Sequence, residues 1–162
     1  MIDEIDKKIL NLLQENGRMS NAEIARRLKM APSGILERIR KLESSGIIEN
    51  YEVRLDHKKL GLVLTVFILV KTADPVGSTA IGHEIARIEE VQEVFYIAGE
   101  FNYLVKARVS HTDALTELLK KFGKIEGVID TRTTLVLQEI LETLRLDLSE
   151  VKERKNRRKR KE

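Results

Sequence analysis

The 162-residue sequence contains no cysteine. Disulfides and thiolate zinc sites are therefore excluded, and a metal site would have to use carboxylates and histidines. The three histidines, His57, His83 and His111, are scattered and do not have the spacing of metal ligands. We expect no metal site and no cofactor.

Long hydrophobic runs are also missing. The longest apolar stretch, Leu60–Val70, is shorter than the roughly 20 residues that cross a bilayer. The opening residues, MIDEIDKKIL, are acidic and helical in pattern, unlike the basic and then apolar pattern of a signal peptide. We expect a cytoplasmic protein that contacts no membrane.

Catalytic motifs are a third absence. The sequence has no G-x-S-x-G motif and no glycine-rich loop of the kind that cradles phosphates. His83 and His111 fall within or near the start of predicted helices, where a surface or capping role is expected. We assign no catalytic residue and expect that the protein is not an enzyme.

Charge is unevenly distributed, although the net charge is only +3. Residues 1–60 contain 12 Lys and Arg against 10 Asp and Glu, residues 61–148 contain 9 against 13, and residues 149–162 contain 8 against 3. This pattern indicates two domains and a basic tail, with any polyanion meeting the two ends. Charged residues form 34% of the chain and glutamine is rare, a balance that suits the ion-pair networks of a thermophilic prokaryote.

The first third of the sequence has the pattern of three short helices. Asp3 is placed to cap the first helix, and Gly17 stands where a left-handed C-terminal residue is expected. Ser20 and Glu23 fit a capping box at the start of the second helix. Apolar residues at helical spacing give both helices a buried face.

The third predicted helix, within Met30–Gly46, is amphipathic and basic. Pro32 suits its first turn because the missing amide proton has no partner there, and Gly46 provides the stop. Small residues come early on the polar face and basic residues later. The buried face holds Ile35, Ile39 and Leu42, and the opposite face holds Ser33, Glu37, Arg40 and Lys41, with Gly34 and Arg38 at its edges.

This arrangement of a short helix, a tight turn and a second helix is the one that a helix-turn-helix presents to the major groove of DNA. Small residues would approach base edges, and basic residues would reach phosphates. A plain three-helix bundle with a solvated, charged face fits the same pattern, so pattern alone does not decide between the two. The candidate DNA-binding residues are Asn21, Pro32, Ser33, Gly34, Glu37, Arg38, Arg40 and Lys41.

Four further motifs are IDxIDxxIL at Ile2–Leu10, NGRMSNAEIA at Asn16–Ala25, RIRKLESSGII at Arg38–Ile48 and AGEFNYLVK at Ala98–Lys106. With these motifs the chain resembles the Lrp/AsnC (leucine-responsive, feast/famine) transcription regulators, to about residue 140. One departure is Ala31, where many relatives carry a serine that caps the third helix. The resemblance implies a sequence-specific regulator on double-stranded DNA, modulated by a small amino-acid-like effector.

The predicted fold is α+β. Residues 1–50 would form a (winged) helix-turn-helix domain and 51–61 a strand and hinge linker. Residues 62–148 would form a ferredoxin-like βαββαβ domain that binds effector and dimerises, and 149–162 a basic tail. The resemblance implies a homodimer that can assemble further into tetramers or octamers.

Strand-like and helical patterns alternate after Gly46. Strand, helix and strand occur twice, which predicts four antiparallel strands with both helices on one face. In the family, two subunits pair through the open face of this sheet. The expected strands cover residues 47–56, 63–72, 91–99, 103–109 and 131–140, and the expected helices end near 89 and span 112–122.

The resemblance also implies a small-molecule site around the loop between the second and third strands of this domain, with the last strand of a neighbouring subunit. A glycine there exposes backbone amides, and threonines offer hydroxyls. An equally open alternative is that the glycine only forms a hairpin and the threonines are ordinary strand residues. Asn102 replaces the aspartate that is common in the family. The candidate effector-binding residues are Gly99, Glu100, Phe101, Asn102, Tyr103, Thr131, Thr133 and Thr134.

Two other functions are compatible with the same build. Some relatives are described as sirohaem decarboxylases, and such an enzyme would hold sirohaem and lack affinity for DNA. An architectural protein that coats DNA would share the helices and the tail but would not respond to an effector. The tail itself, Ser149–Glu162, is either a solubilising segment or a non-specific DNA clamp.

Overall fold

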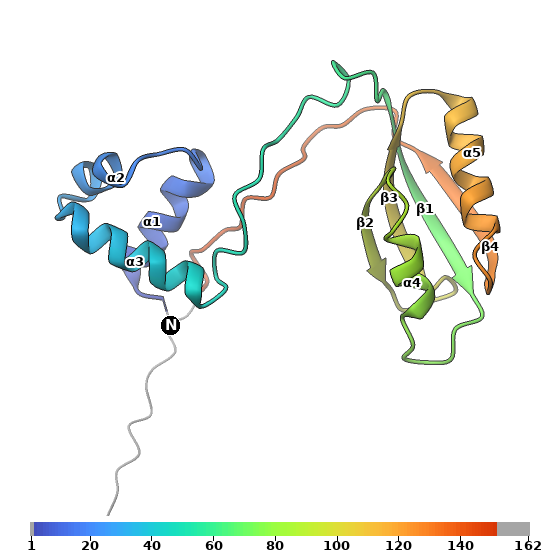
Figure 1. The fold of residues 1–162 in the computed structure, drawn as a ribbon, viewed down its shortest axis with the longest axis horizontal. Coiled ribbons are helices and arrows are strands. Elements are labelled where there is room, and N and C mark those ends of the chain that lie inside the picture. Colours follow the sequence, from blue (N-terminus) through green and yellow to red (C-terminus); the bar gives the residue numbers. More distant parts are fainter. Residues whose placement is uncertain (1, 152–162) are drawn as a thin grey trace, which may run out of the picture. The chain divides into compact units, whose positions relative to one another are not determined.

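The computed structural model describes residues 2–151. The chain divides into two compact units, one of Met1–Val53 with Thr143–Glu162 and the other of Arg54–Glu142 (Figure 1). Residues 143–148 are thus grouped with the first unit, whereas the sequence pattern assigns them to the second domain. The basic residues from Lys152 onward lie outside the described part of the chain.

The first unit contains three helices: α1 (Glu4–Glu15), α2 (Asn21–Leu28) and α3 (Pro32–Ser44). Two predicted caps are present, because the Asp3 carboxylate accepts hydrogen bonds from first-turn amides of α1 and Ser20 Oγ accepts one in α2. α3 begins without a side-chain cap from Ala31, and Gly46 follows its end at φ 72°. One buried core joins the helices: Ile9, Leu10, Ile24, Ala25, Ile35, Ile39 and Leu42.

Three details of the helix ends differ from the prediction. Gly17 is not left-handed, because the chain leaves α1 in an extended conformation. Lys29, which follows α2 at φ 55°, is left-handed, although nothing in the sequence pattern indicated it. Glu23 does not complete a capping box, since its carboxylate binds Arg26 and Arg27 instead.

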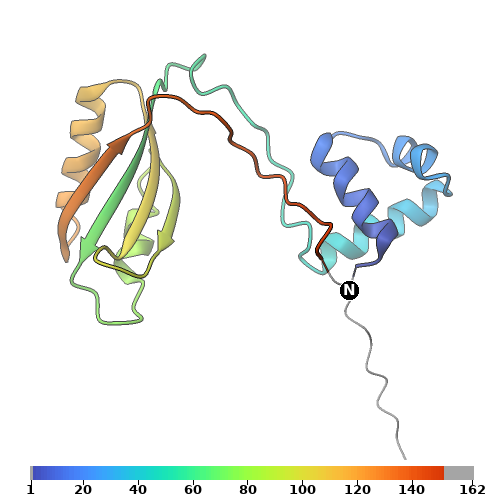
Figure 2. The same ribbon diagram turned by 180° about the vertical axis from the view of Figure 1, so that it is seen from behind.

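The second unit is a four-stranded antiparallel sheet with two helices. Its elements are β1 (Leu64–Thr72), α4 (Ala80–Ile85), β2 (Val91–Tyr96), β3 (Tyr103–Val109), α5 (Thr112–Gly123) and β4 (Val128–Leu135). The strand order is β2-β3-β1-β4. Both helices cover the same face of the sheet, which is seen from its other side in Figure 2. The predicted ferredoxin-like order is confirmed.

Strand alternation gives this sheet one buried and one open face. Val66, Ile68 and Val70 of β1 are fully buried under the helices. Their neighbours Phe67 and Leu69 point to the opposite side and are only partly buried. Pairing in register adds further residues to this open face, which we define as Phe67, Leu69, Phe95 and Leu104.

Several predicted boundaries are wrong. The last strand begins at Val128 and ends at Leu135, whereas the strand-forming residues suggested 131–140. Residues 47–56 form no strand, and α4 ends at Ile85 rather than near residue 89. His111 does cap α5, because its Nδ1 accepts a hydrogen bond from the Ala114 amide at 3.2 Å. Within residues 2–151, no helix is long and apolar enough to cross a bilayer.

A charge cluster holds the segment after β4 against β3. Lys106 and Arg108 are nearly buried, and both bind the Glu142 carboxylate, Arg108 at 2.8 Å. These two cations lower the pKa of Glu142 to about 2. His57 Nε2 lies 3.0 Å from Glu139 Oε2, and this contact and a hydrogen bond from Thr65 lower the pKa of Glu139 to about 2.

Candidate DNA interface and effector loop

The polar face of α3 is open to solvent. Ser33, Glu37, Arg40 and Lys41 are exposed, as is Pro32 in the first turn. The opposite side of the helix carries the buried residues of the three-helix core. α3 starts at Pro32 and Ser33, so its first turn carries small residues. The exposed cations Arg40 and Lys41 follow two turns later. α3 therefore presents hydrogen-bonding groups first and positive charge later.

Arg38 does not belong to that free face. Its Nη1 lies 2.7 Å from Asp3 Oδ2 and 2.7 Å from Asp6 Oδ1, at the start of α1. These two hydrogen bonds raise the pKa of the Arg38 guanidinium. The predicted phosphate contact from Arg38 conflicts with this arrangement, because the guanidinium already ties α3 to the first turn of α1.

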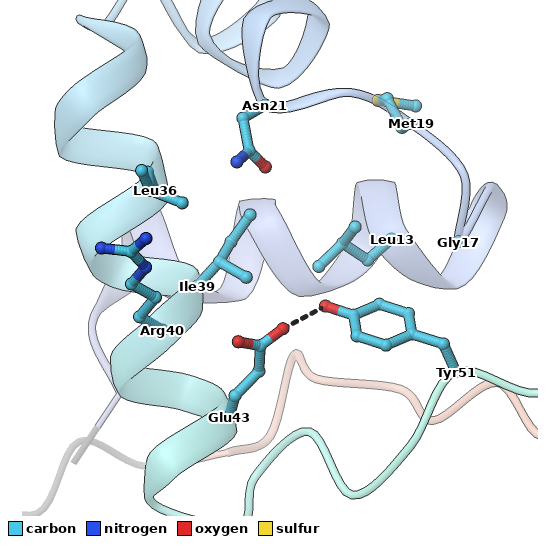
Figure 3. A pocket seen from close by; sticks show the side chains of 9 residues that line it. All are labelled: Leu13, Gly17, Met19, Asn21, Leu36, Ile39, Arg40, Glu43 and Tyr51. Carbon is cyan, nitrogen blue, oxygen red and sulfur yellow. Dashed lines mark hydrogen bonds between the residues drawn. The ribbon is translucent and has the colours of Figure 1, made fainter.

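Arg40 and Asn21 line a shallow depression between the helices. The depression has a volume of about 290 Å³, and Leu13, Leu36 and Ile39 contribute apolar walls (Figure 3). Tyr51 and Glu43 lie at its edge, where the Tyr51 hydroxyl donates a hydrogen bond to Glu43 Oε1 at 3.0 Å. Asn21 is the first residue of α2 and is half-buried, whereas Arg40 is exposed.

Two cations near the end of α2 were not among the candidates. Arg26 and Arg27 are exposed and share the Glu23 carboxylate, at 2.7 and 2.8 Å. Both arginines lower the pKa of Glu23 to about 2. The sequence did indicate this cluster, because Arg26 and Arg27 come three and four residues after Glu23, and those spacings bring side chains together on a helix.

The loop between β2 and β3 is anchored by its last residues. The backbone amide of Asn102 donates a hydrogen bond to the Val70 carbonyl at 2.9 Å. The side-chain oxygen Oδ1 of Asn102 accepts one from the backbone amide of Thr72 at 2.8 Å. The Phe101 ring is buried, with the Arg132 guanidinium 5.1 Å from its centre. Phe101 and Asn102 therefore fix the loop to its neighbouring strands.

Tyr103, the next residue, is also committed to the fold. Its ring is buried against Gly82, where a Cβ atom would collide with it. The hydroxyl donates to Asp74 Oδ2 at 2.8 Å, and burial together with this carboxylate raises the pKa of Tyr103 to about 12. Gly99, at φ 141°, and Glu100 remain exposed at the loop tip. Among the candidate residues of this loop, Gly99 and Glu100 are therefore the exposed ones.

The three candidate threonines of β4 do not form one cluster. Thr131 pairs with Val70 and Thr133 with Ile68, so both share the helix-covered side of the sheet. Thr134 pairs with Phe67 and points to the open face. Alternation along a strand makes this division unavoidable.

The two units define a class of protein: a DNA-binding regulator with a helix-turn-helix unit and a separate ferredoxin-like unit. A winged helix-turn-helix DNA-binding family matches residues 2–49, and the Lrp/AsnC ligand binding domain matches residues 65–146. The leucine-responsive regulatory proteins of Escherichia coli K12 and Klebsiella pneumoniae are each 37% identical over 148 residues, 90% of either chain. The chain belongs to the Lrp/AsnC family of transcription regulators.

Solved structures agree with this membership. A transcriptional regulator of Neisseria meningitidis in complex with L-Met superposes with a TM-score of 0.85 at 32% identity, covering 92% of this chain and 98% of that one. The feast or famine regulatory protein of Mycobacterium tuberculosis, complexed with L-methionine, has a TM-score of 0.84 at 29% identity, with 90% and 99% covered. Both domains of this chain therefore have counterparts in known regulators.

Proposed function

We propose that α3 reads base edges in the major groove and that an amino acid bound near the loop tip modulates this binding. The observation that carries the first part is the exposed polar face of α3. Ser33, Gly34 and Glu37 lie early enough on the helix to meet base edges, and Arg40 and Lys41 are free to meet phosphates. Arg38 takes a positioning role, because it is bound to α1.

The effector proposal is supported by the relatives that were solved with methionine. In this chain the exposed groups of the loop are Gly99 and Glu100, and the Asn102 side chain lies behind them. A backbone amide of the glycine could bind a carboxylate, and Glu100 could bind an ammonium group. Among the threonines, Thr134 on the open face is the one best placed to meet a second subunit.

We also propose that the protein is a cytoplasmic homodimer that can assemble further. The open face of the sheet carries Phe67, Leu69, Phe95 and Leu104, and Phe95 is 48% exposed. Apolar surface of this kind is typical of an interface between subunits. A dimer of helix-turn-helix units would favour an inverted repeat with half-sites about 10 base pairs apart or a multiple of that spacing.

Mapping of bound DNA across the genome, with and without a panel of free amino acids, tests the proposal. We expect a defined site sequence and a change in occupancy with at least one amino acid. Occupancy without sequence choice or effector response would favour an architectural protein. A purified protein that holds sirohaem and binds no DNA would favour the decarboxylase-like enzyme; we propose that this protein has no such activity.

A further inference from the structure

The side chain of Gln14 binds the chain's C-terminal segment to α1. Gln14 lies in the last turn of α1, and its amide forms two hydrogen bonds with the backbone of Leu146. The Leu146 amide donates to Gln14 Oε1 at 2.6 Å, and Gln14 Nε2 donates to the Leu146 carbonyl at 3.2 Å. Both residues belong to the same compact unit. Because both backbone groups of one residue are satisfied, the pairing fixes the segment's position along α1.

An apolar anchor follows two residues later. Leu148 packs, partly buried, against the core of the three helices, whereas the side chain of Leu146 is 67% exposed. The segment then turns, because Asp147 Oδ1 accepts a hydrogen bond from the Ser149 amide at 2.9 Å and the Val151 amide donates to the Leu148 carbonyl at 3.3 Å. The segment is thus bound by a backbone clamp and a buried leucine together.

The sequence beyond this anchor is strongly basic. Eight of the eleven residues from Lys152 to Glu162 are Lys or Arg, and the first of them comes only four positions after Leu148. Eleven residues can span at most about 36 Å when extended, roughly one turn of DNA. When α3 is bound to DNA, cations within this reach can displace counterions from nearby phosphates.

We infer that the flank of α1 is a docking site for this chain's own C-terminal segment, and that docking delivers the basic residues 152–162 to DNA bound by α3. The inference rests on the proposed DNA binding. In the docked state the tether from the anchor at Leu148 to Lys152 is four residues long. Without that anchor, the tether starts at Glu142 in the charge cluster and is ten residues long. Since effective concentration falls as about the −3/2 power of tether length, release should weaken the contribution of the tail about fourfold.

Docking itself can be tested by cross-linking, because the chain has no cysteine of its own. The full-length double variant Gln14→Cys, Leu146→Cys is treated with a short thiol-bridging reagent. We expect a bridge within one chain, read as a compact monomer on a denaturing gel and as a linked peptide by mass spectrometry. The matched control pairs Lys8→Cys with Leu146→Cys, since Lys8 is exposed on α1 and lies six residues before Gln14, about 9 Å away along the helix axis. A bridge between two chains, or equal bridging in the control, would overturn docking in cis.

The link to DNA needs a second measurement. Binding of a fixed duplex is measured over a range of salt for the full chain and for a chain ending at Val151, each with Gln14 or with Gln14→Ala. We expect truncation to lower the salt slope by about 0.9 logarithmic units for each phosphate that the tail neutralises. Gln14→Ala should weaken binding by up to about fourfold in the full chain and leave the truncated chain unchanged.

The outcomes separate the two proposals. Equal effects of Gln14→Ala in both chains, or no effect in either, would overturn the delivery of the tail while leaving DNA binding by α3 intact. Failure of every chain, including the wild type, to bind DNA would instead refute the proposed function. Leu148→Ala should reproduce the effect of Gln14→Ala in the full chain, and circular dichroism reports whether that variant is folded.

Discussion

The Arg38 guanidinium of α3 lies 2.7 Å from the Asp6 carboxylate of α1, and the Asp6 side chain is 12% exposed. The same carboxylate accepts a hydrogen bond from the Asp3 amide, so the capping of α1 and the position of α3 share one group. The orientation of the proposed recognition helix is therefore coupled to the first turn of the chain.

Arg38→Ala should destabilise the first unit by about 2 kcal/mol, because it removes charged hydrogen bonds to Asp3 and Asp6 and leaves a nearly buried carboxylate without its cation. Urea unfolding measures the change. Arg40→Ala is the matched control, since Arg40 is exposed on the same helix and its removal should alter stability by less than about 0.5 kcal/mol. Equal stability of the two variants would show that the ion pair does not hold α3.

Acid should weaken the second unit. The pKa of Glu142 is lowered from its ordinary 4.5 to about 2 by Lys106 and Arg108. A carboxyl group with a lowered pKa stabilises the fold above its ordinary pKa, and this stabilisation is lost as the pH falls toward the folded value. Stability should thus be level from pH 7 to about 5 and fall between about 5 and 2.

Urea unfolding at several pH values, followed through an NMR signal of the Tyr103 ring, reports on this unit. Glu142→Gln should be less stable at pH 7 and should lose less stability in acid than the wild type. Glu100→Gln, which alters an exposed loop residue, should retain the wild-type profile. A profile that is unchanged in Glu142→Gln would mean that other groups cause the loss of stability.

Gly82→Ala should destabilise the second unit by about 1 to 3 kcal/mol, because the added methyl group collides with the buried Tyr103 ring. Gly123→Ala is a suitable control, since a Cβ atom there meets nothing within 4 Å. Thermal unfolding compares the two. If both variants melt together, the packing of Tyr103 on α4 contributes less than the close approach indicates.

Asn102→Asp should keep the fold, because either side chain offers an oxygen to the Thr72 amide. The aspartate adds a negative charge behind the loop tip. A charge-assisted hydrogen bond to an ammonium group exceeds a neutral one by about 1 kcal/mol or more, so at least one amino acid should bind up to about tenfold more tightly. Calorimetric titration with the twenty amino acids is the measurement. Micromolar binding by the wild type with no gain on substitution would refute the role of Asn102.

Local signals predicted much of the fold. Asp3, Ser20 and Pro32 mark helix starts through effects within a few residues, and runs of strand-forming residues mark β1 and β3. The ends of β4 were misjudged because strand-forming residues continue past Leu135, where pairing with β1 stops. Local sequence carries no information about where a partner strand ends.

The candidate sites were harder to predict, because they depend on partners distant in sequence. Arg38 meets carboxylates 32 and 35 residues away, and Gln14 meets Leu146 at a separation of 132 residues. Helical spacing placed Arg38 near the polar face but could not reveal its partners. The division of Thr133 and Thr134 between two faces was available from strand alternation alone.

The most direct test of DNA reading by α3 is selection of preferred duplexes from a random library by the wild type and two variants, Glu37→Ala and Arg40→Ala, with affinities measured by filter binding. We predict that Arg40→Ala weakens binding to all sequences alike, because it removes a phosphate contact, and leaves the preferred site unchanged. Glu37→Ala should instead change the preferred bases within each half-site. Unchanged affinity and unchanged preference in both variants would contradict the account and leave the polar side of α3 as a solvated surface.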